Sequence, residues 1–112
     1  MAWQKARQAT KLVYIETASG EFARDFDLKG QIRRATISIM ANIAEGFGRK
    51  SDKEFANFLS IAHASAYEVE SHLYIARDLD YITVETFEHI YDSLSEICRM
   101  IYALRRSLEG KD

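Results

Sequence analysis

The stretch that decides the fold is residues 87–108, which read FEHIYDSLSEICRMIYALRRSL. Its apolar residues recur at alternating steps of three and four, so they share one face of an α-helix. Thr83 is placed to act as the N-cap, and Glu85 lies in the first turn, near the positive end of the helix dipole. The pattern predicts a helix over residues 84–108. Its apolar stripe consists of Phe87, Ile90, Leu94, Ile97, Ile101, Leu104 and Leu108.

The segment before this stretch shows the same repeat. Ser51 and Glu54 have the spacing of a capping box, which satisfies backbone donors at the start of a helix. The repeat then predicts a helix over residues 52–79, and the short connection 78–82 folds the two helices into a long antiparallel hairpin. The stripe of this helix consists of Phe55, Leu59, Ala62, Ala66, Val69, Leu73 and Ala76.

Two further helices are predicted in the first half of the chain, over residues 3–18 and 28–45. The first ends at Ser19-Gly20, and Asp27 is a suitable N-cap for the second. Four amphipathic helices with short connections predict an all-α fold, an antiparallel up-down four-helix bundle. We expect one domain over residues 1–112, with the hairpin formed by its third and fourth helices.

The ends of the second helix carry glycine and phenylalanine. Gly46 or Gly48 is expected to adopt the left-handed conformation that ends many helices. Phe22 and Phe26 lie in the connection between the first two helices. We expect both rings to close that end of the bundle.

Bulk composition agrees with long helices and narrows the classes of function. The 112 residues are 47% hydrophobic and 29% charged, and they include five glycines and no proline. The formal charge is −2, with +3 on residues 1–56 and −5 on residues 57–112, so an anion-binding surface should come from the first half. Cys98 is the single cysteine, and no signal peptide or membrane-length apolar run is found. We expect a cytoplasmic protein with no membrane partner.

The second helix has more apolar surface than one bundle needs, because its apolar residues cover well over half of the helix circumference. A bundle core requires a stripe only slightly wider than about 100°. The surplus favours a homo-oligomer interface, and the alternative is a centrally placed helix in a compact monomer. The apolar residues are Ile32, Ala35, Ile37, Ile39, Met40, Ala41, Ile43 and Ala44.

A ladder of polar side chains occupies the remaining arc of the second helix. These side chains either face solvent, hold neighbouring helices in register through hydrogen bonds, or line an interface or channel in the assembly. Ile39 lies beside them, and Ile39→Asp is expected to dissociate the assembly or to unfold the chain. The ladder consists of Gln31, Arg34, Ser38, Asn42 and Glu45.

No motif for catalysis, cofactor binding or metal binding stands out. The loop Gly46–Ser51 lacks the glycine spacing and preceding strand of a phosphate-binding loop. The pairs Glu68/His72 and Glu85/His89 are better explained as ordinary pairing on helix surfaces than as metal ligands. Cys98 is best explained as a small buried hydrophobe. We therefore predict a protein that is not an enzyme and has no cofactor and no metal site.

Basic residues of the first half offer an alternative function. Repeated around a ring, they would gather into one positive surface that contacts phosphates. This alternative describes a nucleic-acid-binding accessory module. Its candidate anion contacts are Arg33, Arg34, Arg49 and Lys50.

Residues 31–46, QIRRATISIMANIAEG, resemble the signature of the 23S rRNA-intervening sequence protein family, also called the four-helix-bundle protein family. The resemblance implies an up-down bundle, commonly a homopentamer, with no settled biochemical activity. A related bundle, the accessory variability determinant of diversity-generating retroelements, works as a pentameric partner of a reverse transcriptase and nucleic acid. Ala23 and Met40 stand where the family often has proline, so the sequence does not decide whether the second helix is kinked.

These observations favour a non-enzymatic homo-oligomer, pentameric by resemblance, that serves as a scaffold or adaptor. Its partners are a second copy of the chain and, beyond that, an RNA, DNA or protein molecule that the sequence does not identify. An oligomer interface is expected on the second helix.

Overall fold

The computed structural model describes residues 1–109, and these residues form helices and short connections with no strand. This confirms the predicted all-α class. The ends of the four long helices differ from the predicted ends by no more than two residues. The helices are α1 Ala2–Glu16, α2 Gly20–Arg24, α3 Phe26–Phe47, α4 Asp52–Asp78 and α5 Val84–Glu109.

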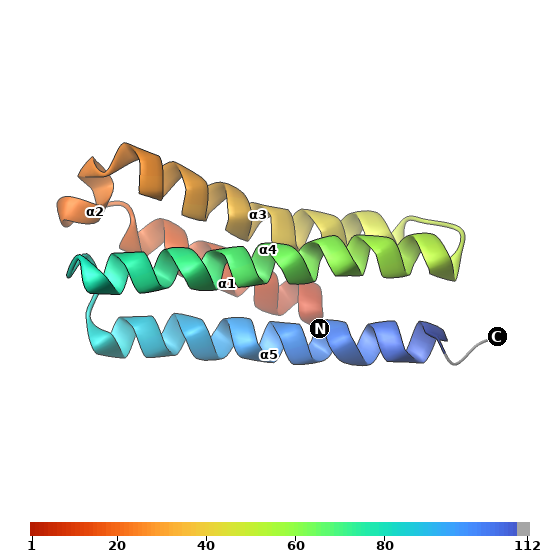
Figure 1. The fold of residues 1–112 in the computed structure, drawn as a ribbon. Helices are drawn as coiled ribbons and strands as arrows, with labels where there is room; N and C mark the ends of the chain where they lie inside the picture. The colour runs from red at the N-terminus through yellow and green to blue at the C-terminus, as the bar shows by residue number, and fades with distance from the viewer. Residues whose placement is uncertain (110–112) are drawn as a thin grey trace.

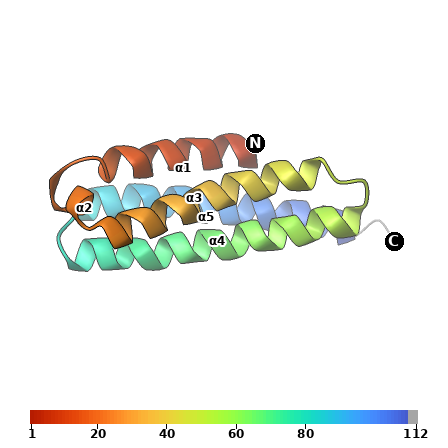
Figure 2. The ribbon, with the colours of Figure 1, turned by 90° about the horizontal axis from the view of Figure 1, so that it is seen from above.

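The four long helices lie side by side as a bundle of 50 × 22 × 19 Å (Figures 1 and 2). Each long helix runs opposite to the one before it, so α4 and α5 form the predicted hairpin (Figure 1). Helix α3 packs on both α1 and α4, and α5 packs on both α1 and α4. Helix α1 is shorter than the other three long helices and covers only part of the bundle's length (Figure 2).

The predicted apolar stripes meet in one core. On α4, the stripe residues from Leu59 to Ala76 are buried. On α5, the buried stripe residues are Phe87, Ile90, Leu94, Ile97 and Ile101. Small residues of α1 complete the core, because Ala6 and Ala9 have no exposed surface. None of the helices within residues 1–109 is long and apolar enough to cross a membrane.

The predicted caps of the last two helices are confirmed. The backbone N–H of Glu54 donates to Ser51 Oγ at 3.1 Å, and that of Thr86 donates to Thr83 Oγ1 at 3.1 Å. The predicted cap of α3 is wrong. Asp25, not Asp27, accepts from the N–H of Leu28 at 3.1 Å, so the helix begins at Phe26.

The earlier start of α3 also changes which aromatic rings close the end of the bundle where the chain passes from α1 to α3. Phe22 lies on the short helix α2, which the sequence analysis missed, and is 1% exposed as predicted. Phe26 lies in the first turn of α3 and is 78% exposed, so its predicted role in closing the bundle is wrong. Tyr81 packs against Phe22, with ring centroids 5.4 Å apart, and donates a hydrogen bond to Asp25 at 3.0 Å.

Neither glycine at the end of α3 adopts the predicted left-handed conformation. Gly48 caps the helix with a φ of −83°. Gly46 is buried, and a Cβ at this position would lie 2.7 Å from Cδ1 of Phe55. Its role is therefore close approach of α3 and α4. The left-handed residues within 1–109 are Gly20, with a φ of 66°, and Asp80, with a φ of 60°.

Candidate functional site

One side of α3 presents apolar residues that the chain itself does not cover. Ile37 is 42% exposed and Phe47 is 60% exposed, and Ala41 and Ala44 between them are exposed as well. The spacing of 37, 41, 44 and 47 keeps these residues on one side of the helix. We call these four residues the α3 face.

At the C-terminal end of α3, the α3 face borders an open hollow of about 570 Å³. The hollow is lined by Ala41, Ala44, Glu45, Gly48 and Arg49. Glu45 and Arg49 form an ion pair with 2.8 Å between Oε2 and Nη2 at the edge of the hollow. The Arg49 guanidinium also lies 4.7 Å from the ring centroid of Phe58. The hollow therefore has a small-residue floor and a charged edge.

The rest of the apolar surface of α3 is covered by its own bundle. Ile32, Ile39 and Ile43 are 1% exposed or less. Ile39 therefore belongs to the core, and its predicted place in an oligomer interface is wrong, because no part of its side chain reaches the surface. The wide apolar coverage of the helix thus has two parts, a buried edge and the exposed α3 face.

The predicted polar ladder lies along the contact between α3 and α4 at its centre. The Ser38 hydroxyl hydrogen-bonds the hydroxyl of buried Ser65 on α4 at 2.8 Å. Asn42 Nδ2 donates to the carbonyl oxygen of Ser38 at 2.8 Å and to its hydroxyl at 3.0 Å. The Ser38–Ser65 bond links α3 to α4, one of the roles that the sequence left open, and the Asn42 bonds lie within α3 and orient Ser38.

The outer members of the ladder make contacts along α3 itself. Gln31 Nε2 donates to Oδ1 of Asp27 at 3.0 Å, and Glu45 pairs with Arg49. Arg34 is exposed, and its Nη1 lies 3.0 Å from the position that a Cβ on Gly30 would occupy. The side chain of Arg34 therefore lies back along α3 beside the α3 face.

The four candidate anion contacts do not gather on one face of the chain. Arg33 points toward α1, where its Nε donates to Thr17 Oγ1 at 2.8 Å and its guanidinium lies 4.2 Å from the ring centroid of Tyr14. Arg49 and Lys50 lie at the far end of α3, where Arg49 is paired and Lys50 is exposed. A common positive surface would require several copies of the chain.

Residues considered for metal binding or nucleophilic chemistry have ordinary surroundings. His72 Nε2 lies 3.3 Å from Glu68 Oε2, one turn away on α4, and the His72 side chain is 12% exposed. Within residues 1–109, no cluster of three or more His, Cys, Asp or Glu side chains is arranged to hold a metal ion. Burial, with a smaller contribution from the Glu70 carboxylate, raises the pKa of the Cys98 thiol to about 11. The thiol is therefore protonated at neutral pH and is a poor nucleophile.

Comparison with known protein families identifies proteins that this chain is similar to. A family model for the 23S rRNA-intervening sequence protein matches residues 1–103, which span α1 to α4 and most of α5. The chain belongs to this family. The 23S rRNA-intervening sequence protein model therefore confirms the resemblance seen in residues 31–46. No curated protein matches the chain.

A solved structure supports the same assignment. It is that of a protein of unknown function from the S23 ribosomal protein family of Bacteroides thetaiotaomicron VPI-5482. The two chains superpose with a TM-score of 0.85 at 29% sequence identity, over 94% of this chain and 98% of the other. Neither this relative nor the 23S rRNA-intervening sequence protein family is described as an enzyme.

The structure also contains a surface groove that the sequence analysis did not identify. It lies between α4 and α5 and is lined by His63, Tyr67, Cys98, Arg99 and Tyr102. No local pattern links these residues, because they come from two helices and because tyrosines at helical spacing usually pack in cores and interfaces. The exposure of Tyr67 and Tyr102, 58% and 54%, depends on packing that periodicity does not specify.

Proposed function

We propose that this protein is a non-enzymatic, homo-oligomeric scaffold or adaptor whose subunits meet through the α3 face. The observation that carries this proposal is the exposed apolar surface of Ile37, Ala41, Ala44 and Phe47 beside an otherwise complete core. Apolar surface of this kind, continuous along a helix, is typical of a contact with another protein.

The residues of the α3 face suit a contact between helices. Ala41 and Ala44 are small, which lets a second helix approach closely, and Ile37 and Phe47 provide large apolar groups on either side of them. The charged pair Glu45–Arg49 and the exposed Arg34 lie at the border. An apolar centre with a polar rim is the usual composition of a subunit interface.

The family resemblance favours five subunits over other numbers. A pentamer would have a mass of about 65 kDa, five times the 12.9 kDa of the chain. In a closed ring, the α3 face of each subunit would contact a neighbour, and the role of the protein would be to present the outer surfaces of the ring to a partner.

Size-exclusion chromatography with multi-angle light scattering tests this proposal. The unmodified chain should elute as an oligomer near 65 kDa, and Ile37→Asp should elute near the 12.9 kDa of one chain with its helical circular dichroism retained. Ile37 is 42% exposed, so a charge at this position is solvated in the monomer but would be desolvated in the interface.

Ile15→Asp is the matched control. Ile15 is 54% exposed on α1, outside the α3 face, so this substitution adds the same charge without entering the proposed interface. We expect its mass to equal that of the unmodified chain. A monomeric unmodified chain at micromolar concentration would overturn the proposal, and so would an Ile37→Asp oligomer of unchanged mass.

A further inference from the structure

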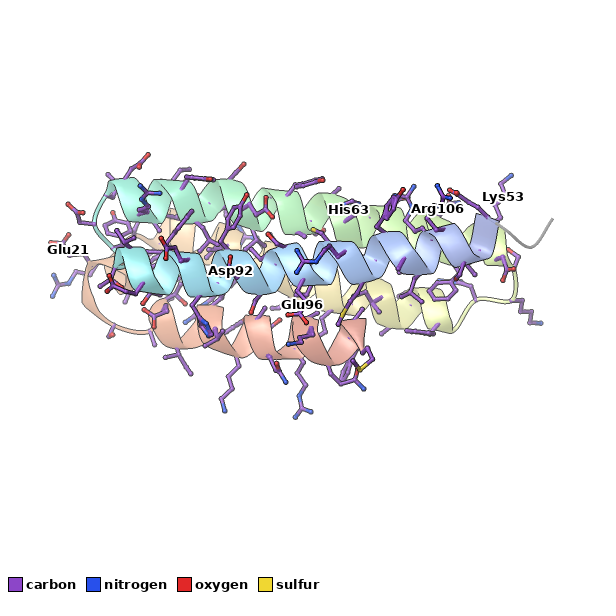
Figure 3. The ribbon with its side chains drawn as sticks, turned by 90° about the horizontal axis from the view of Figure 1, so that it is seen from below. Glu21, Lys53, His63, Asp92, Glu96 and Arg106 are labelled. Atoms are coloured by element: carbon purple, nitrogen blue, oxygen red, sulfur yellow. The ribbon has the colours of Figure 1, made fainter. Side chains whose placement is uncertain are left out.

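The groove between α4 and α5 is an open hollow whose lining combines aromatic rings with a positive charge. Its volume of about 480 Å³ lies within the range of roughly 300–1,000 Å³ that small-molecule sites occupy. None of its five lining residues, His63, Tyr67, Cys98, Arg99 and Tyr102, is acidic, although residues 57–112 carry a net charge of −5. Figure 3 shows His63 on α4, on the side next to α5.

Aromatic rings provide stacking surfaces in the groove. Tyr67 and Tyr102 are 58% and 54% exposed, from α4 and α5 respectively. The His63 ring stacks on Tyr67 with centroids 4.7 Å apart and an interplanar angle of 27°, which fixes the orientation of both rings. Burial, and then the charge of Arg105, lowers the pKa of His63, so its imidazole is neutral at neutral pH. Neutral and electron-rich rings of this kind stack well on a planar ligand.

One arginine of α5, Arg99, lines the groove, and a second, Arg105, lies near its His63. Arg105 lies close enough to His63 to influence its pKa, and the Nε atom of Arg105 is buried without a hydrogen-bond partner within residues 1–109. A buried donor without an acceptor is costly, and an anion within its reach would remove that cost. Guanidinium groups bind phosphate oxygens in a well-defined geometry.

We propose that the α4/α5 groove binds a nucleotide, with its base stacked on Tyr67 and its phosphate bound by Arg99. A nucleotide joins a planar ring to an anion, and the groove offers both complementary groups. The neutral thiol of Cys98 forms part of the wall and takes no part in chemistry. The same chemistry is present in a free nucleotide and in one unit of a single strand. This site is separate from the α3 face and does not depend on self-association.

Isothermal titration calorimetry with adenosine 5′-monophosphate tests the proposal. We expect a Kd below about 1 mM for the nucleotide. Adenosine and ribose 5-phosphate should each bind about tenfold more weakly, because the first lacks the anion and the second lacks the ring. Equal binding of ribose 5-phosphate and the nucleotide, or no binding of the nucleotide at millimolar concentration, would overturn the proposal.

Variants locate the site. Arg99→Gln and Tyr67→Leu should each weaken nucleotide binding about tenfold. Arg106→Gln is the matched control, because Arg106 is exposed on α5 two turns beyond Arg99 and does not line the groove (Figure 3). If the affinity for the nucleotide falls as much in Arg106→Gln as in Arg99→Gln, the effect is one of overall charge, and this result would contradict the proposal.

A final comparison identifies the source of the nucleotide. If the physiological ligand is a single strand, a short oligodeoxyadenylate should bind more tightly than the mononucleotide and should show the same loss in Tyr67→Leu. If it is a free nucleotide, the oligomer should bind no more tightly than the mononucleotide. Oligomer binding that is unaffected by Tyr67→Leu would contradict the proposed site.

Discussion

Two isoleucines of α3, two residues apart, differ completely in their surroundings. Ile39 has no exposed surface, and Ile37 is 42% exposed on the α3 face. The buried edge of α3, formed by Ile32, Ile39, Ile43 and Gly46, completes the core of one chain. The exposed face contributes little to that core. The comparison shows that a helix with apolar residues around most of its circumference can stabilise the fold through one side and remain available through the other.

The largest effect that the comparison predicts is that of a charge at Ile39. Ile39→Asp places a carboxylate in the core without a partner, and we expect a loss of at least about 4 kcal/mol in the free energy of unfolding. A domain of this size has only about 5–15 kcal/mol in total, so the loss is a large fraction of its stability and should lower the urea midpoint strongly. Circular dichroism with urea titration measures the loss. Ile37→Asp should retain its helical signal, and equal loss of helix in both variants would contradict the distinction between the two sides.

The two glycines at the end of α3 sharpen the comparison at a smaller scale. Gly46→Ala should cost about 1–3 kcal/mol, because the added Cβ would lie 2.7 Å from Phe55 Cδ1 and 3.2 Å from Phe58 Cβ. Gly48→Ala is the control, since its Cβ would meet only the Glu45 carbonyl oxygen at 3.5 Å. We expect it to be neutral or slightly stabilising, because alanine restricts the unfolded chain. Thermal unfolding of the two variants under the same conditions measures this difference in stability.

Much of the fold could be predicted because its signals are local. The stripes of α4 and α5 repeat over several turns, and their caps, Ser51 and Thr83, lie next to the first turn that each one stabilises. The predicted N-cap of α3, Asp27, was wrong, because Asp25 and Asp27 are the same residue type and their local sequence does not show which one caps the helix. Tyr81, 56 positions from Asp25 in the chain, donates a hydrogen bond to Asp25, and no local pattern could show this.

In the candidate sites, too, some features have local sequence signals and others depend on contacts between distant residues. That α3 has surplus apolar surface could be predicted from residue type alone. Which apolar residues are buried could not, because Ile37 and Ile39 are the same residue type and only the orientation of α3 in the bundle distinguishes them. The groove at His63 and Tyr102 depends on the register of α4 against α5. Periodicity specifies the face of each helix but not the height at which two faces meet.

Ser38 lies between the buried edge of α3 and the α3 face, and its hydrogen bond to Ser65 of α4 gives a prediction of intermediate size. Ser38→Ala should cost about 1 kcal/mol, because buried Ser65 loses its partner at 2.8 Å and Asn42 loses one of its acceptors. Ser38→Ala combined with Ser65→Ala should cost less than the sum of the single variants, since removing both hydroxyls leaves neither one unpaired. A double-mutant cycle from urea unfolding measures the coupling. Strictly additive losses would show that the hydroxyls do not interact.

The smallest expected effect concerns two adjacent arginines. Arg33 joins α3 to α1 through its hydrogen bond to Thr17 and its position over the Tyr14 ring, so Arg33→Gln should cost about 0.5–1 kcal/mol. Arg34 lies back over Gly30 on the exposed side, and Arg34→Gln should change the free energy of unfolding by less than about 0.5 kcal/mol. Unfolding in urea at a single low protein concentration gives both values. A larger loss for Arg34 than for Arg33 would mean that the exposed side of α3 is already in contact with another chain under those conditions, because nothing within one chain would account for it.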